Sequence, residues 1–383
     1  MSLGEGWVKL SVVCDVMTNL EGSARPAVCL AEGLRERGWD VSVVSPAMLG
    51  DVEEKLSQRG IEPVNLGARL LSKGVDPSLL WLEGWGREAF LGLNKRLLDE
   101  AGPFNVNFSH MVAVPSQAWY LQGPPSRALD DISREFPWYL RLAYGALRPL
   151  FSWADGRLVG RMRRFSGLVV ANSRFCASMY SRWGVSVDDV VYPPLDLKVF
   201  HPSPKPSSDY VLTYFGKETA YSVVKEVADR GVRVKAFGSK GQLLASPLKK
   251  RLLGHPNVEF LGRVTCEELV DLYSNALYTL FPFTHEPFGY IPLESMACGV
   301  PVLTFKAQGP GEYVVDGYTG WLAESRSEMV EKALEIWRDG YPREMGLNCV
   351  REASRFDGRL YIERWMRLLE DSLEKTPPRR RED

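Results

Sequence analysis

The sequence predicts an α/β protein made of two doubly wound domains with parallel sheets, which face each other across a cleft. The first observation is that apolar runs typical of buried strands alternate with helical patterns along the chain. The second is a segment rich in proline and serine, residues 201–209, which interrupts this alternation and has the composition of a linker. The third is that the alternation then restarts, so each half of the chain is expected to form its own domain.

The first half opens with a strand, a helix and a second strand. Residues 7–16 are an apolar run typical of a buried strand, residues 26–38 have the apolar spacing of a helix, and residues 40–46 return to strand character. Three later segments continue the pattern as strands, namely residues 103–110, 167–173 and 189–194. We therefore predict an N-terminal domain over residues 1–202.

The second half repeats this rhythm from residue 210 onward. Strands are expected at residues 210–216, 232–238, 258–262 and 277–283, and helices at residues 221–230, 243–253, 266–276 and 291–298. The last long helical pattern covers residues 356–374. We predict a C-terminal domain over residues 203–350, a helical segment over residues 351–375, and a disordered tail over residues 376–383.

Composition limits the class of protein. The 383 residues allow about two to three domains, and a net charge of −1 gives the chain no overall attraction to nucleic acid. The six cysteines are far apart, with no CxxC pair, so neither a zinc site nor a disulfide framework is expected and a reducing cytoplasm fits best. We find neither a signal peptide pattern nor a membrane-spanning apolar run. A soluble or peripheral protein is expected.

Residues 285–301 carry two carboxylates, Glu286 and Glu294, on either side of Gly289. Glu286 lies in the loop after a predicted strand, and Glu294 lies one turn inside the following helix. Backbone N–H groups at a helix start favour an anion such as a diphosphate, which carboxylates would repel. Carboxylates instead accept hydrogen bonds from hydroxyl groups, and both members of a sugar diol can donate to one carboxylate. The segment is thus predicted to bind a nucleotide sugar.

These residues carry a family resemblance. The two glutamates with seven residues between them and an internal EPFG, the run LESMACGVPV and the downstream GPGEYVVDGYTGWL resemble the retaining glycosyltransferases of family four, described as glycosyl transferases group 1. Membership would imply the GT-B fold, which has two Rossmann-like domains and a terminal helix that returns to the first domain. The resemblance covers nearly the whole chain and is densest over residues 262–322.

The resemblance implies a donor site. Glu286 would contact hydroxyl groups of the donor sugar and act as a catalytic residue, while Glu294 would hold the ribose diol. Contacts to sugar, phosphate and base would come from Phe288, Gly289, Tyr290, Arg263 and Val264. No metal or other cofactor is implied, because the nucleotide sugar is itself the substrate and its leaving diphosphate helps to deprotonate the acceptor on the same face.

The diphosphate also needs cations. Lys217 follows the strand-ending Gly216, where the family usually has an arginine, and is expected to bind a phosphate. The family's second lysine has no counterpart, which leaves Lys240 or Lys225 as candidates. Both are equally candidates for solvated surface charges, and a weakened or inactive donor site would follow if neither binds the diphosphate.

Two residues of the N-terminal, acceptor-binding domain match the family pattern. Gly22 lies where the family has a glycine-rich loop near the acceptor and the phosphates, although only one glycine of the usual pair is present. His110 closes a predicted strand and would hydrogen-bond the transferred sugar or the acceptor as a catalytic residue. The alternative for His110 is a structural role.

Residues 134–165 interleave arginines with aromatic and leucine side chains. Such a stretch suits the surface of an anionic membrane, from which a lipid-linked acceptor would be approached. The alternative is an ordinary pair of helices whose apolar face is core and whose arginines lie in solvent. Pro137 and Pro149 are expected to interrupt any single long helix here.

We therefore expect a retaining glycosyltransferase that moves a hexose from a nucleotide sugar to a glycan or a lipid-linked acceptor. Its expected place is the cytoplasm, either free or peripheral on the inner face of the membrane. One alternative is transfer to a soluble sugar, as in sucrose or trehalose synthesis. The other is a non-catalytic nucleotide-binding subunit with the same fold, for which the missing lysine argues. No pattern in the sequence identifies the donor sugar, the base, the linkage, the acceptor or the oligomeric state.

Overall fold

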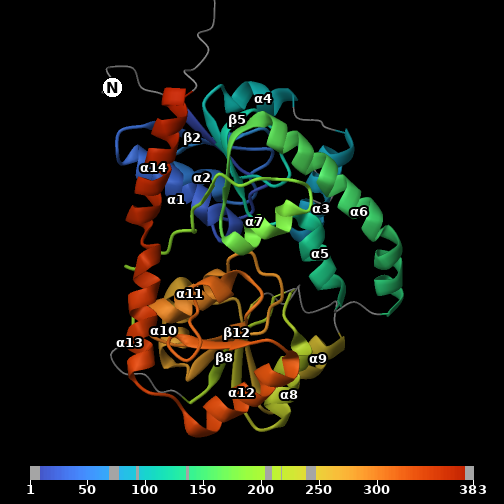
Figure 1. The fold of residues 1–383 in the computed structure, drawn as a ribbon, viewed down its shortest axis with the longest axis vertical. Helices are drawn as coiled ribbons and strands as arrows, with labels where there is room; N and C mark the ends of the chain where they lie inside the picture. Colours follow the sequence, from blue (N-terminus) through green and yellow to red (C-terminus); the bar gives the residue numbers. More distant parts are fainter. Residues whose placement is uncertain are drawn as a thin grey trace, which may run out of the picture. The chain divides into compact units, whose positions relative to one another are not determined.

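The structure is a computed structural model that describes residues 9–68, 77–91, 95–134, 138–202, 209–216, 218–238 and 247–375. Its chain divides into two compact units. The first comprises Met1–Ser126, Pro149–Pro194 and Gly358–Asp383, and the second comprises Arg127–Arg148 and Leu195–Asp357. Each unit contains one parallel sheet with its own helices (Figure 1). The predicted tail over residues 376–383 and most of the predicted linker lie outside the described residues.

The sheet of the first unit has the strand order β3-β2-β1-β4-β5-β6-β7, and every neighbouring pair is parallel. Its strands are β1 Lys9–Val13, β2 Asp40–Ser45, β3 Glu62–Asn65, β4 Asn105–Asn107, β5 Ser116–Leu121, β6 Ser166–Ala171 and β7 Asp189–Val190. The chain moves outward from β1 to β3 and then returns to the other side of β1 at β4. The strand order therefore reverses between β1 and β4, where ligands of doubly wound sheets bind beyond the carboxyl ends of the strands.

The helices that alternate with these strands along the chain are η1 Gly22–Ala24, α1 Arg25–Arg35, α2 Val52–Gln58, α3 Pro77–Leu91, α4 Lys95–Ala101, α5 Pro125–Arg134, α6 Trp138–Phe165 and α7 Arg174–Ser181. Of these, most of α5 and the start of α6 fall within Arg127–Arg148, which is assigned to the second unit. The final helix, α14 Gly358–Lys375, belongs to the first unit and lies beside α1 (Figure 1). Gly33 of α1 makes this approach possible, because a Cβ there would stand 2.5 Å from Ile362 of α14. The predicted return of the terminal helix to the first domain is confirmed.

The sheet of the second unit has the order β10-β9-β8-β11-β12-β13 and is also parallel throughout. Its strands are β8 Val211–Tyr214, β9 Val234–Phe237, β10 Val258–Gly262, β11 Tyr278–Phe281, β12 Val302–Phe305 and β13 Gly320–Ala323. Its helices are α8 Tyr221–Asp229, α9 Pro247–Leu253, α10 Cys266–Asn275, α11 Tyr290–Ala297, η3 Gly309–Glu312, α12 Arg326–Asp339, α13 Glu344–Ala353 and η4 Ser354–Phe356. Here the order reverses between β8 and β11.

One expectation about the helices is wrong. Pro149 does not end a helix, because α6 runs unbroken over Trp138–Phe165 with Pro149 inside it. Proline removes the backbone hydrogen bond to the carbonyl group of the residue four positions earlier, which is Gly145, and its ring crowds that carbonyl group. Both positions lie in an exposed part of the helix, so water can satisfy the carbonyl group that proline leaves without a donor.

Candidate functional site

The first part of the candidate site is the loop between β11 and α11 in the second unit. Gly289 caps α11 with a φ of 87°, a conformation that side chains rarely adopt. A Cβ at Gly289 would stand 2.8 Å from Pro310 and 3.3 Å from Cγ of Glu286. Glycine therefore lets the loop close against both residues, and it sets the place of Glu286 beside the start of α11.

A chain of hydrogen bonds holds the backbone of Glu286. Its N–H donates to Oε1 of Gln308 at 3.3 Å, and its carbonyl accepts from the N–H of Gly309 at 2.8 Å. Gln308 is buried and donates in turn to the hydroxyl of Thr304 on β12, at 2.7 Å. His285, just before Glu286, has a φ of 62°, which is rare for a residue other than glycine and is typical of functional sites.

Glu294 lies one turn inside α11 and is only 3% exposed. Its Oε2 accepts a hydrogen bond from the hydroxyl of Tyr273 on α10 at 3.1 Å. A buried carboxylate is costly unless its oxygens receive hydrogen bonds, and such groups are concentrated at functional sites. Tyr273 thus supports Glu294 in a place where its acceptor oxygens suit further hydroxyl donors.

Tyr313 holds the same loop through hydrogen bonds to its backbone. Its hydroxyl donates to the carbonyl of Gly289 at 2.5 Å and to that of Phe288 at 3.2 Å. Burial raises the pKa of Tyr313 well above its usual value, and the charges of Glu286 and Glu294 act in the same direction. Both carboxylates therefore act electrostatically on one buried phenol.

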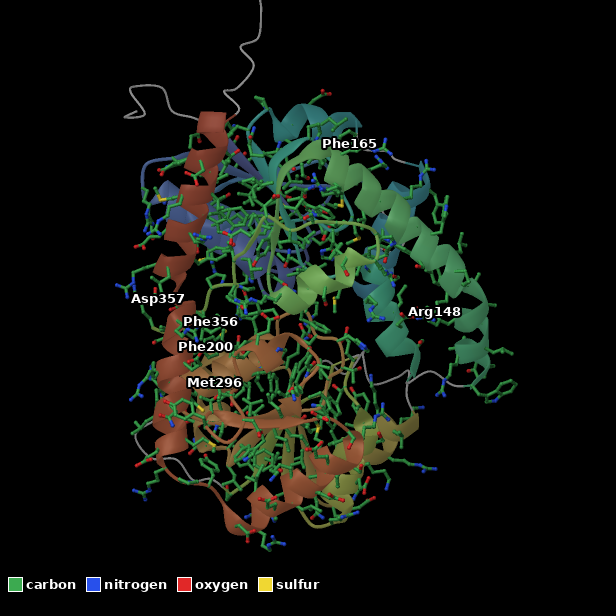
Figure 2. All side chains as sticks on the ribbon, viewed as in Figure 1. Arg148, Phe165, Phe200, Met296, Phe356 and Asp357 are labelled. Atoms are coloured by element: carbon green, nitrogen blue, oxygen red, sulfur yellow. The ribbon has the colours of Figure 1, made fainter. Side chains whose placement is uncertain are left out.

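Aromatic packing buries Phe288, whereas the nearby Tyr290 is only half-buried. The ring of Phe288 is buried and lies 5.5 Å from Tyr290, 5.6 Å from Tyr313 and 5.9 Å from Phe356. Figure 2 labels Phe356 at the end of the second unit. The backbone of Phe288, Gly289 and Tyr290 is thereby held rigidly at the N-terminus of α11, where N–H groups have no partner within the helix.

Arg263 and Val264 lie in the turn after β10, at the carboxyl edge of the same sheet. Arg263 is exposed and Val264 is half-buried. Because all strands are parallel, this edge also carries the ends of β8, β9, β11 and β12, so the structure brings the turn to the same edge as Glu286.

Only one of the three lysines considered as cations for the diphosphate lies among the described residues. Lys217 and Lys240 lie outside the described residues. Lys225 is on α8 and forms an ion pair with Asp229 at 2.5 Å, four residues along the helix. This contact matches the interpretation of Lys225 as a surface charge.

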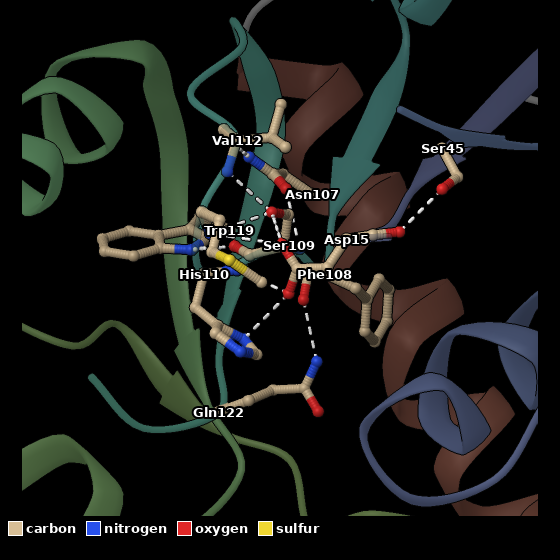
Figure 3. Close-up of polar contacts among 10 residues, drawn as sticks. Asp15, Ser45, Asn107, Phe108, Ser109, His110, Val112, Trp119 and Gln122 are labelled. Atoms are coloured by element: carbon tan, nitrogen blue, oxygen red, sulfur yellow. Dashed lines mark hydrogen bonds and ion pairs between the residues drawn. The ribbon is translucent and has the colours of Figure 1, made fainter. Parts of the chain in front are cut away.

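The second part of the candidate site is in the first unit, where the strand order reverses between β1 and β4. His110 follows β4, and its Nδ1 is 3.2 Å from Oδ2 of Asp15, which follows β1 (Figure 3). Both side chains are largely buried, at 10% and 14% exposure. Hydrogen bonds from Trp119 to the carbonyl of Ser109 and from Gln122 to that of Phe108 hold the segment before His110.

Asp15 was not predicted from the sequence. Its only local signal is a carboxylate placed after a buried strand, and its contact with His110 spans 95 residues. Gly22 also follows β1 and opens η1 with a φ of 59°, with open space where a Cβ would stand. The structure thus places both residues predicted for the first domain, His110 and Gly22, after the two strands at the reversal point.

Comparison with known proteins identifies the family of the second unit. Residues 217–353 match the family model described as glycosyl transferases group 1, so the predicted family is confirmed. The D-inositol 3-phosphate glycosyltransferase of Mycolicibacterium smegmatis is 33% identical over 159 residues, which are 36% of each protein. The chain spans only 25% to 40% of the length of several curated relatives that it matches.

Solved structures resemble a larger part of the chain. HepE of Anabaena, in complex with UDP and glucose, has a TM-score of 0.71 at 18% identity and covers 94% of this chain and 99% of its own. Sucrose-phosphate synthase of Thermosynechococcus elongatus has a TM-score of 0.74 at 16% identity and covers 96% of this chain and 100% of its own. At such identities these similarities support the fold alone, and they confirm the predicted GT-B fold of two parallel α/β domains.

Proposed function

Residues 217–353 belong to glycosyl transferases group 1, and from this premise we propose that the protein is a retaining glycosyltransferase that moves a hexose from a nucleotide sugar to a glycan or a lipid-linked acceptor. The observation that carries the proposal is the pair Glu286 and Glu294 at the N-terminus of α11, at the reversal point of the second sheet. That is where a doubly wound sheet binds its ligand.

In this proposal Glu294 holds the ribose diol. Its burial and its hydrogen bond from Tyr273 support that role, because a desolvated carboxylate gains most from hydroxyl donors. Glu286 contacts the donor sugar. The hydrogen bonds from its backbone to Gln308 and Gly309 suit a catalytic group, which has to be held in one position.

The diphosphate binds at the start of α11, with backbone groups of Phe288, Gly289 and Tyr290 facing it. Lys217 and Lys240 supply cations, and Arg263 with Val264 lines the base. HepE, whose fold resembles this one, was solved with UDP-glucose, which supports a nucleotide-sugar donor.

Transfer proceeds without a metal in this proposal. The positive end of the α11 dipole and the lysines offset the charge of the leaving diphosphate, and that group takes the proton of the acceptor hydroxyl on the face where the new bond forms. Chelation by EDTA should then leave the rate of transfer unchanged. A loss that Mg²⁺ restores would contradict this part of the proposal.

The acceptor is presented at an anionic membrane surface in our proposal, on the cytoplasmic side. No helix among the described residues is long and apolar enough to cross a bilayer. Helix α6 nonetheless exposes large apolar side chains, with Trp138 at 76%, Leu142 at 71% and Trp153 at 53%. Exposed patches of this kind mark interaction surfaces.

A binding screen tests the donor site. UDP-, GDP- and ADP-sugars are added to the full chain, and affinity is measured by thermal shift and calorimetry. One donor should stabilise the wild type and lose affinity in Glu294→Ala, whereas Glu286→Gln should bind it normally but fail to transfer the sugar. Donor binding without transfer to any acceptor would favour the alternative of a non-catalytic nucleotide-binding subunit. Transfer to soluble sugars alone would contradict the proposal of an acceptor at the membrane.

A further inference from the structure

The contacts of Asp15 suggest a function for it that depends on the proposed glycosyl transfer. We propose that Asp15 is a positioning residue, which fixes the tautomer of His110 so that Nε2 accepts a hydrogen bond from a hydroxyl group of the sugar or the acceptor. The proposal starts from the pairing of β1 with β4, which places the residues after these strands side by side.

The direction of each hydrogen bond follows from Ser109. Its Oγ accepts from the N–H of Met111 at 3.0 Å and from that of Val112 at 2.7 Å, so its own proton points to Oδ1 of Asp15. Oδ1 also accepts from the N–H of Met111, at 3.2 Å. Two donors therefore hold Oδ1, and the hydroxyl of Ser109 together with the backbone N–H of Met111 sets the carboxylate plane.

The other carboxylate oxygen, Oδ2, then faces His110. It lies 3.2 Å from Nδ1 and 3.4 Å from the backbone N–H of the same residue. An ionised carboxylate only accepts hydrogen bonds, so an Oδ2 at this distance favours the tautomer with the proton on Nδ1, and in a neutral imidazole Nε2 is then the acceptor. A hydroxyl can donate to such a nitrogen, whereas a phosphate oxygen, which carries no proton, cannot.

The same geometry makes Asp15→Asn a sharp test. Oδ1 accepts from two donors and Oδ2 from the backbone N–H of His110, so asparagine keeps more hydrogen bonds with its amide oxygen at the Oδ1 position. The amide nitrogen then replaces Oδ2, gives up the hydrogen bond from the backbone N–H of His110, and points an N–H toward Nδ1 of the same residue. Nδ1 becomes the acceptor and the proton moves to Nε2. The substitution keeps the size of the side chain and reverses the tautomer.

The experiment measures the tautomer and the transfer separately. Histidine is labelled with ¹⁵N in the full chain, and His110→Gln assigns the His110 signals. The wild type should show a protonated Nδ1 and Asp15→Asn a protonated Nε2. Transfer should fall by about 10- to 100-fold, the loss seen when the hydrogen-bond partner that orients a metal-binding histidine is removed, with donor affinity unchanged. Asp40→Asn, an exposed position of the same unit, is the matched control and should change neither readout.

A double variant separates positioning from general damage. If Asp15 acts through His110, Asp15→Asn combined with His110→Gln should be no slower than His110→Gln alone. Additive losses, a wild-type signal with Nε2 protonated, or a reversed tautomer with full transfer would each overturn the inference. Failure of the proposed function looks different, because the wild type would then neither bind nor transfer any sugar while the nitrogen signals still report on Asp15.

Discussion

Gly289 shows how one residue sets the geometry of the proposed donor site. Its φ of 87° disfavours any side chain, and a Cβ would stand 3.3 Å from Cγ of Glu286. Gly317 has a similar φ of 71°, but nothing lies within 4 Å of the place of its Cβ. A side chain at Gly317 would therefore cause backbone strain alone, whereas one at Gly289 would also collide with Glu286.

We predict that Gly289→Ala lowers transfer by about 100-fold, the effect of displacing a reacting group by on the order of 1 Å. Gly317→Ala should share the cost of the backbone conformation, about 1 to 3 kcal/mol, and keep its rate. Initial rates and urea unfolding of both variants check this. Similar rates in the two variants would mean that the contact with Glu286 is unimportant.

Site residues were predicted from the sequence where they lie close together in a recognisable motif. Glu286, Gly289 and Glu294 are neighbours in the sequence, and their spacing carries the family resemblance. The supporting residues come from distant segments, namely Tyr273, Gln308, Tyr313 and, in the first unit, Asp15. Their contacts depend on which strands become neighbours, and residue type alone does not disclose them.

At the scale of the helix, α14 completes the core of the first unit. Trp365 is fully buried and its ring lies 5.5 Å from Phe108 and 5.6 Å from Tyr120. The hydroxyl of Tyr361 donates to the carbonyl of Pro26 at 2.9 Å. The last helix is therefore part of the first unit's core, although the sequence of the second unit separates it from the rest.

We predict that Trp365→Ala lowers the free energy of unfolding by about 3 to 5 kcal/mol, because it leaves a cavity among these rings. Leu360 lies on the same helix and is 52% exposed, so Leu360→Ala should change stability by no more than about 0.5 kcal/mol. Urea unfolding followed by circular dichroism measures both. Equal losses would contradict the assignment of this stability to the burial of Trp365.

Helix α6 combines two patterns in one element. Its C-terminal half buries Ala154, Leu158 and Met162, among others, whereas its N-terminal half exposes nearly all of its side chains. On the exposed side the apolar residues at 138, 142 and 153 are followed by the exposed arginines 157 and 164. Apolar side chains followed by arginines fit a bilayer interface with anionic headgroups.

We predict that the full chain sediments with vesicles containing phosphatidylglycerol and much less with pure phosphatidylcholine. Leu142→Ser should weaken this binding by on the order of 10-fold, given the apolar area of one leucine. Leu347 on α13 is equally exposed, at 69%, so Leu347→Ser is the matched control and should bind normally. If neither substitution weakens vesicle binding, the exposed face of α6 contacts a protein or another copy of the chain. Size-exclusion chromatography would detect such a complex.

At the scale of the whole molecule, the alternation of strands and helices was sufficient to predict two parallel sheets. It did not predict the complete strand list, since β3, β5, β12 and β13 were missed. Short strands such as β3, with only four residues, carry too few positions for a periodic signal. The two reversal points are long-range features, yet predicted site residues follow their strands in both units, because a doubly wound sheet directs its ligands to these points.

This organisation leads to a prediction about nucleotide binding. The described residues assigned to the nucleotide and the donor sugar, apart from His110 and Gly22, lie in the second unit, so the donor nucleotide should stabilise the two units unequally. At 100 times its dissociation constant, a ligand adds about 2.7 kcal/mol to the stability of the state that binds it. Hydrogen exchange should therefore slow most at β11 and α11 and least at β2 and β3. Glu294→Ala should abolish the difference, because it removes the hydroxyl-binding carboxylate while leaving the fold of both sheets. Equal protection of β2 and β3 in the wild type would contradict the assignment of the nucleotide to residues of the second unit.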